Sequence, residues 1–325
     1  MSTNRSMGGF LGAVVGACLG SPYIFMKSGD ISRDDAGWRL SAPGIEMELA
    51  FAGMRSFARH GVDMDALARA YSSVIRDGVH DLDVVSATIF GENATMASEL
   101  RRRAQESEFG TLCSNALLIR QIPLVIAGRS WDIPTLCGEI SREGRMTHSD
   151  DRVIECAQLY AMVLQGAINR MTRLEIWDRC FEVVRDPENY RMLVSSYYET
   201  PRADGDDYNA VCVATQMALY HFWHDTPFVS ALKNAIRAGG ATDINAAATG
   251  ALLGAMHGVR AIPSTWREEL SAVNAEGSWQ KRCRVALGRV CRMVEEETPG
   301  HMVWRSRRYS DRPLRRASRV KRELI

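Results

Sequence analysis

Residues 239–266 read GGATDINAAATGALLGAMHGVRAIPSTW, and residues 8–22 read GGFLGAVVGACLGSP. In both stretches glycine recurs at every fourth position, namely at Gly8, Gly12, Gly16 and Gly20 and at Gly250, Gly254 and Gly258. Residues four apart lie on one face of an α-helix, so each stretch predicts a helix with a stripe free of side chains. Glycine costs about 1 kcal/mol relative to alanine inside a helix. We therefore expect the stripes to serve close helix–helix approach in the core, the alternative being close approach of a ligand to the backbone.

Helical periodicity continues through most of the chain, whereas strand patterns and hairpin turns are scarce. Segments with apolar residues at helical spacing are 5–19, 45–58, 64–77, 82–106, 152–169, 173–185, 210–224, 227–238, 244–257 and 278–296. Segments rich in Gly, Pro, Asp or Ser predict loops at 27–44, 128–134, 141–150, 199–207 and 239–243. None of these loops is long enough to link two domains. The sequence predicts an all-α protein, with a single compact orthogonal helical domain over residues 1–298 and a basic C-terminal tail over residues 299–325.

The amino-acid composition indicates a folded globular protein. Of the 325 residues 46% are hydrophobic, which is enough for a substantial core and excludes a disordered chain. The 40 Lys and Arg and 39 Asp and Glu give a net charge of +1. The eight cysteines contain no CxxC pair, and the longest apolar runs are about half the ~20 residues of a membrane-spanning helix. We expect an intracellular protein in a reducing compartment, without membrane contact.

Five segments carry a resemblance to a known family. The segment 8–22 resembles the GxLxGxxxGDALGxP motif of the ADP-ribosylglycohydrolases, and 239–266 resembles their GGDTDTxAAxxGAxxGAxxGxxAIPxxW signature. Similar segments in the same order are IEMELAFA at 45–52, CSNALLIRQIP at 113–123, and Thr147 with His148 before a predicted helix. The similarity spans about residues 5–270. It implies the all-helical fold of the dinitrogenase reductase-activating glycohydrolase type, whose members remove ADP-ribose from modified side chains with two magnesium ions.

The residues that the resemblance aligns with the magnesium ligands are mostly replaced. Two magnesium ions need about six oxygen ligands each and several carboxylates to offset their charge. The six positions of the family's Thr-Asp-Asp and Asp-x-Asp-Thr motifs that supply these oxygens hold Ala42, Pro43, Gly44, Ala241, Asp243 and Ile244. The family's Asp in GDALG is Ala17, and the acidic residue that usually follows is Ile24. We expect no cofactor, no metal ligands and no catalytic residues, which predicts a pseudoenzyme.

Two alternative roles for the remaining acidic residues stay open. Asp34, Asp35, Glu46 and Glu48 are the acids that could replace the missing ligands. We favour the simpler explanation, that they are solvated loop acids or acids at the favourable start of a helix. Asp243 precedes the predicted helix 244–257, where an N-cap is worth about 1 kcal/mol and would by itself explain this residue.

The resemblance also implies remnants of the ADP-ribose site. The corresponding residues are Ser114, Asn115, Arg120, His148 and Asp243. The glycine that brings the family's backbone close to the ligand is replaced by Ala116. Phosphates bind closely approaching backbone amides, so this replacement weakens the case for nucleotide binding.

The C-terminal tail is the most charged part of the chain. Residues 303–325 carry nine Lys and Arg and two acids, or +7, which leaves −6 for the other 302 residues. We expect Trp304 and these nine basic residues to bind a partner: Arg305, Arg307, Arg308, Arg312, Arg315, Arg316, Arg319, Lys321 and Arg322. A tail with so little apolar content orders only on a partner, although a merely solvated tail is the alternative.

These observations predict a catalytically inactive ADP-ribosylglycohydrolase-like protein that acts as a structural or binding module. Its expected partner is a protein or an assembly, or a nucleic acid or other polyanion bound through the tail. Two alternatives remain, namely a divergent active ADP-ribosyl hydrolase with rearranged ligands and a protein that binds ADP-ribose or a nucleotide without cleaving it.

Overall fold

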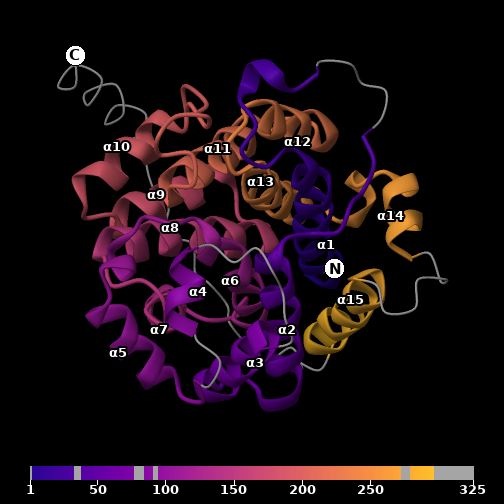
Figure 1. Cartoon of the computed structure of the whole chain (residues 1–325). Helices are drawn as coiled ribbons and strands as arrows, with labels where there is room; N and C mark the ends of the chain where they lie inside the picture. The colour runs from indigo at the N-terminus through magenta and orange to yellow at the C-terminus, as the bar shows by residue number, and fades with distance from the viewer. Residues whose placement is uncertain (1, 33–37, 77–83, 91–93, 272–278, 296–325) are drawn as a thin grey trace.

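Two antiparallel helices, α1 (Ser2–Gly20) and α13 (Thr242–His257), lie side by side at the centre of the molecule (Figure 1). This computed structural model describes residues 2–32, 38–76, 84–90, 94–271 and 279–295. The glycine stripes face each other: a Cβ on Gly12 would lie 2.1 Å from the Gly250 carbonyl oxygen, and one on Gly8 would lie 2.1 Å from that of Gly254. The two backbones therefore touch directly, which confirms that the stripes serve helix–helix approach.

The other helices surround this pair. Figure 1 shows α2 to α7 below it and α9 to α12 above it, with α14 and α15 on the right. The first group and α8 are α2 (Ile45–His60), α3 (Met64–Arg76), α4 (Val84–Phe90), α5 (Ala97–Glu106), α6 (Ala116–Ala127), α7 (Ile133–Gly144) and α8 (Asp151–Ile168). The others are α9 (Arg173–Val183), α10 (Pro187–Ser195), α11 (Val211–Trp223), α12 (Phe228–Arg237), α14 (Ser264–Ser271) and α15 (Trp279–Glu295). Short 3-10 helices are Ser21–Tyr23, Ser28–Asp30, Glu108–Thr111 and Val259–Ala261.

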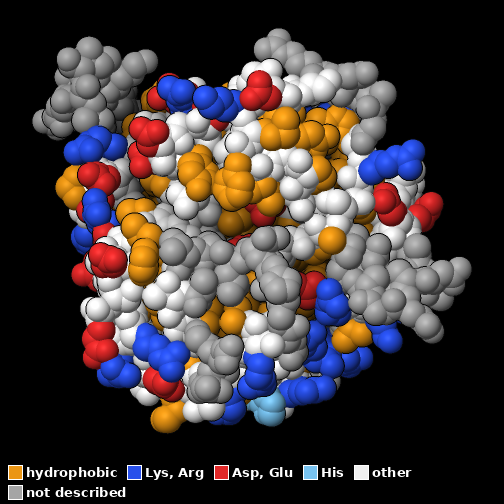
Figure 2. Space-filling view, in the orientation of Figure 1, with side chains coloured by type: hydrophobic (Ala, Val, Ile, Leu, Met, Phe, Trp, Pro, Cys, Tyr) orange, Lys and Arg blue, Asp and Glu red, His pale blue; other side chains and the backbone are white. Residues whose placement is uncertain are grey.

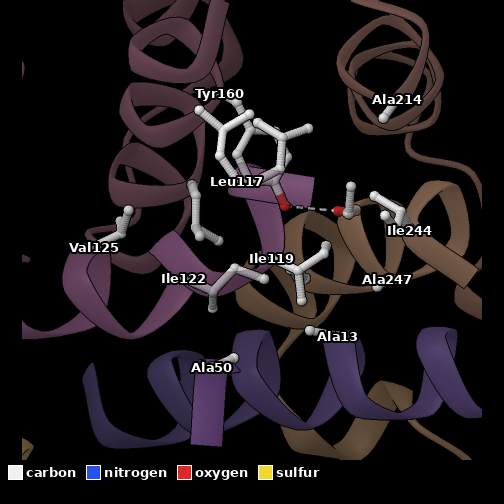
Figure 3. Close-up of a cluster of buried hydrophobic side chains, with 14 of the residues drawn as sticks. Ala13, Ala50, Leu117, Ile119, Ile122, Val125, Tyr160, Ala214, Ile244 and Ala247 are labelled. Carbon is white, nitrogen blue, oxygen red and sulfur yellow. Dashed lines mark hydrogen bonds between the residues drawn. The ribbon is translucent and has the colours of Figure 1, made fainter. Parts of the chain in front are cut away.

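The core is centred on α6, which is buried along nearly its whole length. Figure 3 shows Leu117 and Ile119 of α6 among apolar side chains from several helices, including Ala13 of α1. The hydroxyl of Tyr160 on α8 donates a 2.9 Å hydrogen bond to the Ala248 carbonyl on α13. The core therefore joins both halves of the chain.

The predicted all-α class is confirmed. The described residues form helices and two isolated bridges, Lys27 with Gly239 and Ser114 with Ala210, but no extended strand. The single predicted helix 82–106 is wrong, because α4 ends at Phe90 and α5 begins at Ala97. Asp65 Oδ1 accepts the Ala97 N–H at 2.8 Å and so fixes a new helix start there.

Four helices are absent from the sequence-based prediction: α6, α7, α10 and α14. The predicted loops 128–134 and 141–150 are partly wrong, because α7 covers parts of both. Its first turn contains Pro134, and Asp132 accepts the Thr135 N–H at 2.9 Å as the N-cap. Proline in a first turn starts a helix rather than breaking it, which is why this segment resembles a loop in sequence.

None of the described helices is both long and apolar enough to cross a bilayer. The predicted domain boundary at residue 298 and the basic tail lie outside the described residues.

Candidate functional site

Three segments far apart in the sequence meet at one place: the end of α1, the residues before α2, and the start of α13. Thr242 Oγ1 donates a 2.8 Å hydrogen bond to the Gly20 carbonyl. A Cβ on Gly44 would lie 3.1 Å from Asp243 Oδ2 and 3.2 Å from Glu46 Oε2. The structure therefore brings together the positions that the resemblance aligned with metal ligands, and two carboxylates are present there.

Asp243 lies inside α13 rather than in front of it. Gly239 and Gly240 both have positive φ and turn the chain so that α13 begins at Thr242, with Ala241 as the N-cap. The prediction that Asp243 is an N-cap is wrong, because it is the second residue of the helix. Its side chain is only 7% exposed, and burial raises its pKa to about 6, against an opposing effect of hydrogen bonds from nearby backbone N–H groups.

The carboxylate of Glu48 forms an ion pair with Arg282. Its Oε2 lies 2.7 Å from Nε of Arg282 on α15, and its Oε1 accepts a second 2.7 Å hydrogen bond from the same guanidinium. This two-point pairing is the geometry in which arginine binds a carboxylate most strongly. Glu48 therefore ties α2 to α15, whereas the carboxylate of Glu46 lies beside Gly44, as that of Asp243 does.

The donor set at this junction does not fit two magnesium ions. Within the described ranges, no three His, Cys, Asp or Glu side chains are grouped so that they could hold a metal ion. Asp34 and Asp35, proposed as substitutes, lie outside the described residues. The carboxylates of Asp243 and Glu46 are too few to complete two octahedra or to offset four positive charges.

Ser114 and Asn115 lie just before α6, where the chain is fixed to the start of α11. The Asn115 N–H donates to the Asn209 carbonyl at 2.8 Å, and the Cys113 carbonyl accepts the Val211 N–H at 2.7 Å. The Ser114 hydroxyl accepts the Ala116 N–H at 3.3 Å. The Asn115 side chain is 1% exposed, and its Nδ2 has no hydrogen-bond partner in the described part of the chain.

Arg120 and His148 belong to a buried polar network. Arg120 Nε donates to Glu143 Oε1 at 2.7 Å, and a second guanidinium nitrogen donates to the Thr147 hydroxyl. Tyr71 donates to the same Glu143 oxygen at 3.1 Å. The Thr147 hydroxyl also lies 2.8 Å from His148 Nδ1, while His148 Nε2 has no partner in the ranges described. Burial, reinforced by the charge of Arg120, lowers the pKa of His148 to about 3 and keeps the ring neutral.

Apart from Ser114 and Asn115, which lie just before α6, the candidate residues fall into two groups. Thr147 joins Arg120 to His148 in the core, whereas Gly44 lies against Asp243 at the junction of α1, α2 and α13. Arg120 has no exposed side-chain surface, and Glu143 and Thr147 occupy two of its guanidinium nitrogens.

A model of the ADP-ribosylglycohydrolase family matches residues 2–298. The chain belongs to this family. One relative is the ADP-ribosyl-[dinitrogen reductase] glycohydrolase of Rhodospirillum rubrum, 25% identical over 281 residues that cover 82% of this chain and 90% of the relative. Another is the ADP-ribosylarginine hydrolase Tri1 of Pseudomonas putida (strain GB-1), 26% identical over 157 residues, or 48% of this chain and 42% of the relative. The solved structure of an ADP-ribosylglycohydrolase-related protein complex has the same fold, with a TM-score of 0.73 and 22% identity over 90% of this chain and 98% of the other.

Sequence reasoning missed several polar residues that this ADP-ribosylglycohydrolase fold buries. Glu143, Tyr71 and Gln121 were not singled out, although Gln121 Nε2 donates to Glu143 Oε2 at 2.7 Å. Asn245 was also missed, because it occupies a variable position of the glycine-rich signature. It is fully buried, and neither its side-chain oxygen nor its nitrogen has a hydrogen-bond partner among the described residues. The one signal in the sequence that could have indicated them is a polar residue within an apolar segment.

Proposed function

We propose that this member of the ADP-ribosylglycohydrolase family is a binding module without the family's two-metal hydrolysis. The donor set carries the proposal. Of the six aligned ligand positions Asp243 alone keeps a carboxylate, and Glu46 is the acid that also lies beside Gly44. Ala241 and Ile244 are buried apolar side chains at the start of the same helix. They contribute packing where the family contributes oxygen ligands.

The protonation of Asp243 supports the same conclusion. A carboxyl whose pKa is raised to about 6 binds a proton more tightly than an ordinary aspartate does. A metal ion must displace that proton, so its apparent affinity falls further as the pH drops. Any binding of a dication at Asp243 should therefore weaken as the pH falls below about 6.

A second candidate function is binding of ADP-ribose or a nucleotide without cleavage. Asn115 Nδ2, His148 Nε2 and both polar side-chain atoms of Asn245 are buried without partners in the described part of the chain. Leaving such a group unsatisfied costs about 1–3 kcal/mol, and a bound ligand or water can supply the missing hydrogen bond. The Ala116 methyl, at the position of the family glycine, opposes close approach of a phosphate to this backbone.

The partner of the module is a protein, an assembly or a polyanion. The +7 charge of residues 303–325 and their low apolar content support this part of the proposal. A divergent active hydrolase remains the alternative, in which residues outside the described ranges, such as Asp34 and Asp35, would supply ligands.

Calorimetric titration tests the loss of hydrolysis. Magnesium is added to the full-length protein and to Asp243→Asn, and release of ADP-ribose from an ADP-ribosylated arginine peptide is followed in parallel. We expect no saturable magnesium binding at millimolar concentration and no release by either protein. Magnesium-dependent release by the wild type that Asp243→Asn abolishes would refute the proposal.

The non-cleaving alternative is tested by titrating ADP-ribose in the presence of EDTA. Asn115→Leu removes the unpartnered amide, and Asn209→Ala is the matched control because the Asn209 side chain is exposed and only its backbone contacts Asn115. Metal-independent binding that Asn115→Leu weakens and Asn209→Ala leaves unchanged would favour this function. Equal binding by all three proteins would place the ligand elsewhere.

A further inference from the structure

A chain of buried hydrogen bonds leads from α7 to His148. Arg120 Nε donates to Glu143 Oε1 at 2.7 Å, and a second guanidinium nitrogen donates to the Thr147 hydroxyl. The Thr147 oxygen lies 2.8 Å from His148 Nδ1. All four residues have no exposed surface, so solvent does not compete for any bond of this chain.

The charged end of this chain is fixed within the core. Figure 2 shows Lys and Arg side chains beside Asp and Glu side chains on the left of the molecule, where water and salt screen them. The Glu143 carboxylate is buried instead, and it accepts hydrogen bonds from Arg120, from Tyr71 at 3.1 Å and from Gln121 at 2.7 Å. A carboxylate only accepts and a guanidinium only donates, so the direction of these bonds is settled.

The single proton of the Thr147 hydroxyl determines the direction of the next bond. Because Arg120 donates to the Thr147 oxygen, the hydroxyl keeps its own proton to donate. Its acceptors in the described part of the chain are His148 Nδ1 at 2.8 Å and the Gly144 carbonyl at 3.4 Å. The second distance exceeds the usual range of about 2.5–3.0 Å. The Gly144 oxygen also accepts the backbone N–H groups of Thr147 and His148 already, at 3.1 and 3.0 Å.

The hydroxyl of Thr147 therefore donates to His148 Nδ1. The charge of Arg120 strengthens this bond, since a donor that itself accepts from a cation is more strongly polarised. Burial and then the charge of Arg120 lower the pKa of His148 to about 3, against an opposing effect of Asp150, so the ring is neutral and carries one proton. With Nδ1 as acceptor, this proton lies on Nε2, which is buried and has no hydrogen-bond partner among the described residues.

We propose that Arg120 and Thr147 are positioning residues that hold His148 in the Nε2–H tautomer and so make its ring a fixed hydrogen-bond donor. Neither residue has to touch a ligand for this role. Arg120 directs the hydroxyl of Thr147, and the hydroxyl directs the ring.

The tautomer determines which atoms His148 can bind. An Nε2–H group donates to an acceptor oxygen, whereas a metal ion or an acidic proton needs the lone pair that Nε2 does not offer in this tautomer. An unsatisfied donor in the core costs free energy, so an oxygen of a bound ligand or of a buried water is needed there. For ADP-ribose as that ligand, the inference rests on the non-cleaving function proposed above, but the tautomer does not depend on it.

Nuclear magnetic resonance of the full-length protein with ¹⁵N-labelled histidine tests the tautomer. Long-range ¹H–¹⁵N correlations distinguish a ring nitrogen that carries a proton from one that offers a lone pair. The chain has seven histidines, and His148→Gln identifies the signals of this ring by their loss. Thr147→Val removes the hydroxyl at nearly constant shape, and Thr147→Ser keeps it. The matched control is Thr215→Val, because Thr215 is equally buried and its hydroxyl accepts from Cys156 Sγ at 3.4 Å.

At neutral pH we expect the proton of His148 on Nε2 and the lone pair on Nδ1. Thr147→Val should shift the Nδ1 signal downfield, because a nitrogen lone pair that loses its hydrogen bond is less shielded. Thr147→Ser and Thr215→Val should keep the wild-type signals, and thermal melts establish that every variant is folded. When ADP-ribose is added in EDTA, the Nε2–H proton signal should shift as this group donates to an oxygen of the ligand.

A proton on Nδ1 in the wild type would overturn the inference, and so would an Nδ1 signal that Thr147→Val leaves unchanged. An Nε2–H signal that bound ADP-ribose does not move would identify a buried water as the acceptor and refute ADP-ribose in that place. If calorimetry detects no binding of ADP-ribose, the non-cleaving function fails, while the spectra of the wild type and of Thr147→Val still decide the tautomer.

Discussion

Gly12→Ala should destabilise the protein although alanine is normally the better helix residue. A Cβ at this position would lie 2.1 Å from the Gly250 carbonyl oxygen and 2.7 Å from its carbonyl carbon. Ordinary contacts of a Cβ begin at 3.4 Å, so α1 and α13 would have to separate by about 1.3 Å at this point. The obstacle is backbone on both sides, and no side chain can rotate away to make room.

The size of the effect follows from two opposing contributions. Alanine in place of glycine gains about 1 kcal/mol in helix propensity. Overpacking costs about 1–3 kcal/mol and more where the backbone itself must move. A Cβ on Gly8 or Gly16 would likewise lie 2.1 or 2.2 Å from a backbone oxygen of α13. Separation of the two helices at Gly12 therefore also loosens the packing at Gly8 and Gly16. The upper end of this cost less the gain leaves a net destabilisation of about 2 kcal/mol or more, a large part of the stability of about 5–15 kcal/mol that is usual for a folded protein.

Urea denaturation followed by circular dichroism measures this destabilisation. Gly138→Ala is the matched control, because Gly138 lies in the middle of α7, is exposed, and has no atom within 4 Å of a Cβ. The same substitution should raise the free energy of unfolding there by about 0.5–1 kcal/mol. If Gly12→Ala were as stable as Gly138→Ala, direct contact between the two backbones could not be the reason for the glycine stripes.

Three further predictions concern the candidate site. Because burial raises the pKa of Asp243 from 3.8 to about 6, the folded state holds this proton more tightly than the unfolded state does. The free energy of unfolding should therefore fall by up to about 3 kcal/mol between pH 4 and pH 7, and Asp243→Asn should remove most of this fall in urea titrations across that range. Arg120→Met leaves Glu143 buried without its cation and should lower the free energy of unfolding by about 3–5 kcal/mol. The double variant Arg120→Met with Glu143→Leu should lower it clearly less in the same assay, and equal losses would contradict a buried ion pair. EDTA should leave the melting temperature within about 1 °C of its value in millimolar magnesium. A bound metal at 100 times its Kd would add about 2.7 kcal/mol to the free energy of unfolding, so a melting temperature several degrees higher in magnesium than in EDTA would show an occupied metal site.

The sequence was most informative where one residue type has one structural consequence. The spacing of Gly8, Gly12 and Gly16 predicted a smooth helix face, and that face is where α1 meets α13. The replacement of ligand positions was equally visible, because alanine and proline side chains offer no oxygen in any conformation. Both inferences needed only the local sequence.

The features that sequence reasoning missed depend on distant contacts or on the exact start of a helix. Glu143 and Arg120 lie 23 positions apart, and no local pattern predicts that they meet in the core. The apolar pattern predicted a helix that begins at residue 244, with Asp243 as its N-cap. The turn at Gly239 and Gly240 lets the helix begin two residues earlier, so Asp243 lies in its first turn. The split between α4 and α5 likewise depends on Asp65, a side chain of another helix.

Apolar side chains and an ion pair hold together the junction of α1, α2 and α13 among the described residues. In the family, a cluster of carboxylates at the helix starts would be held together by the charge of two magnesium ions, and without the ions those carboxylates would repel one another. Here Ala241 and Ile244 fill part of that junction with apolar contacts, and Glu48 is neutralised by Arg282 from α15. The pairing also fixes α15 against α2. An acid at the start of α2 therefore determines where this late helix of the described chain lies.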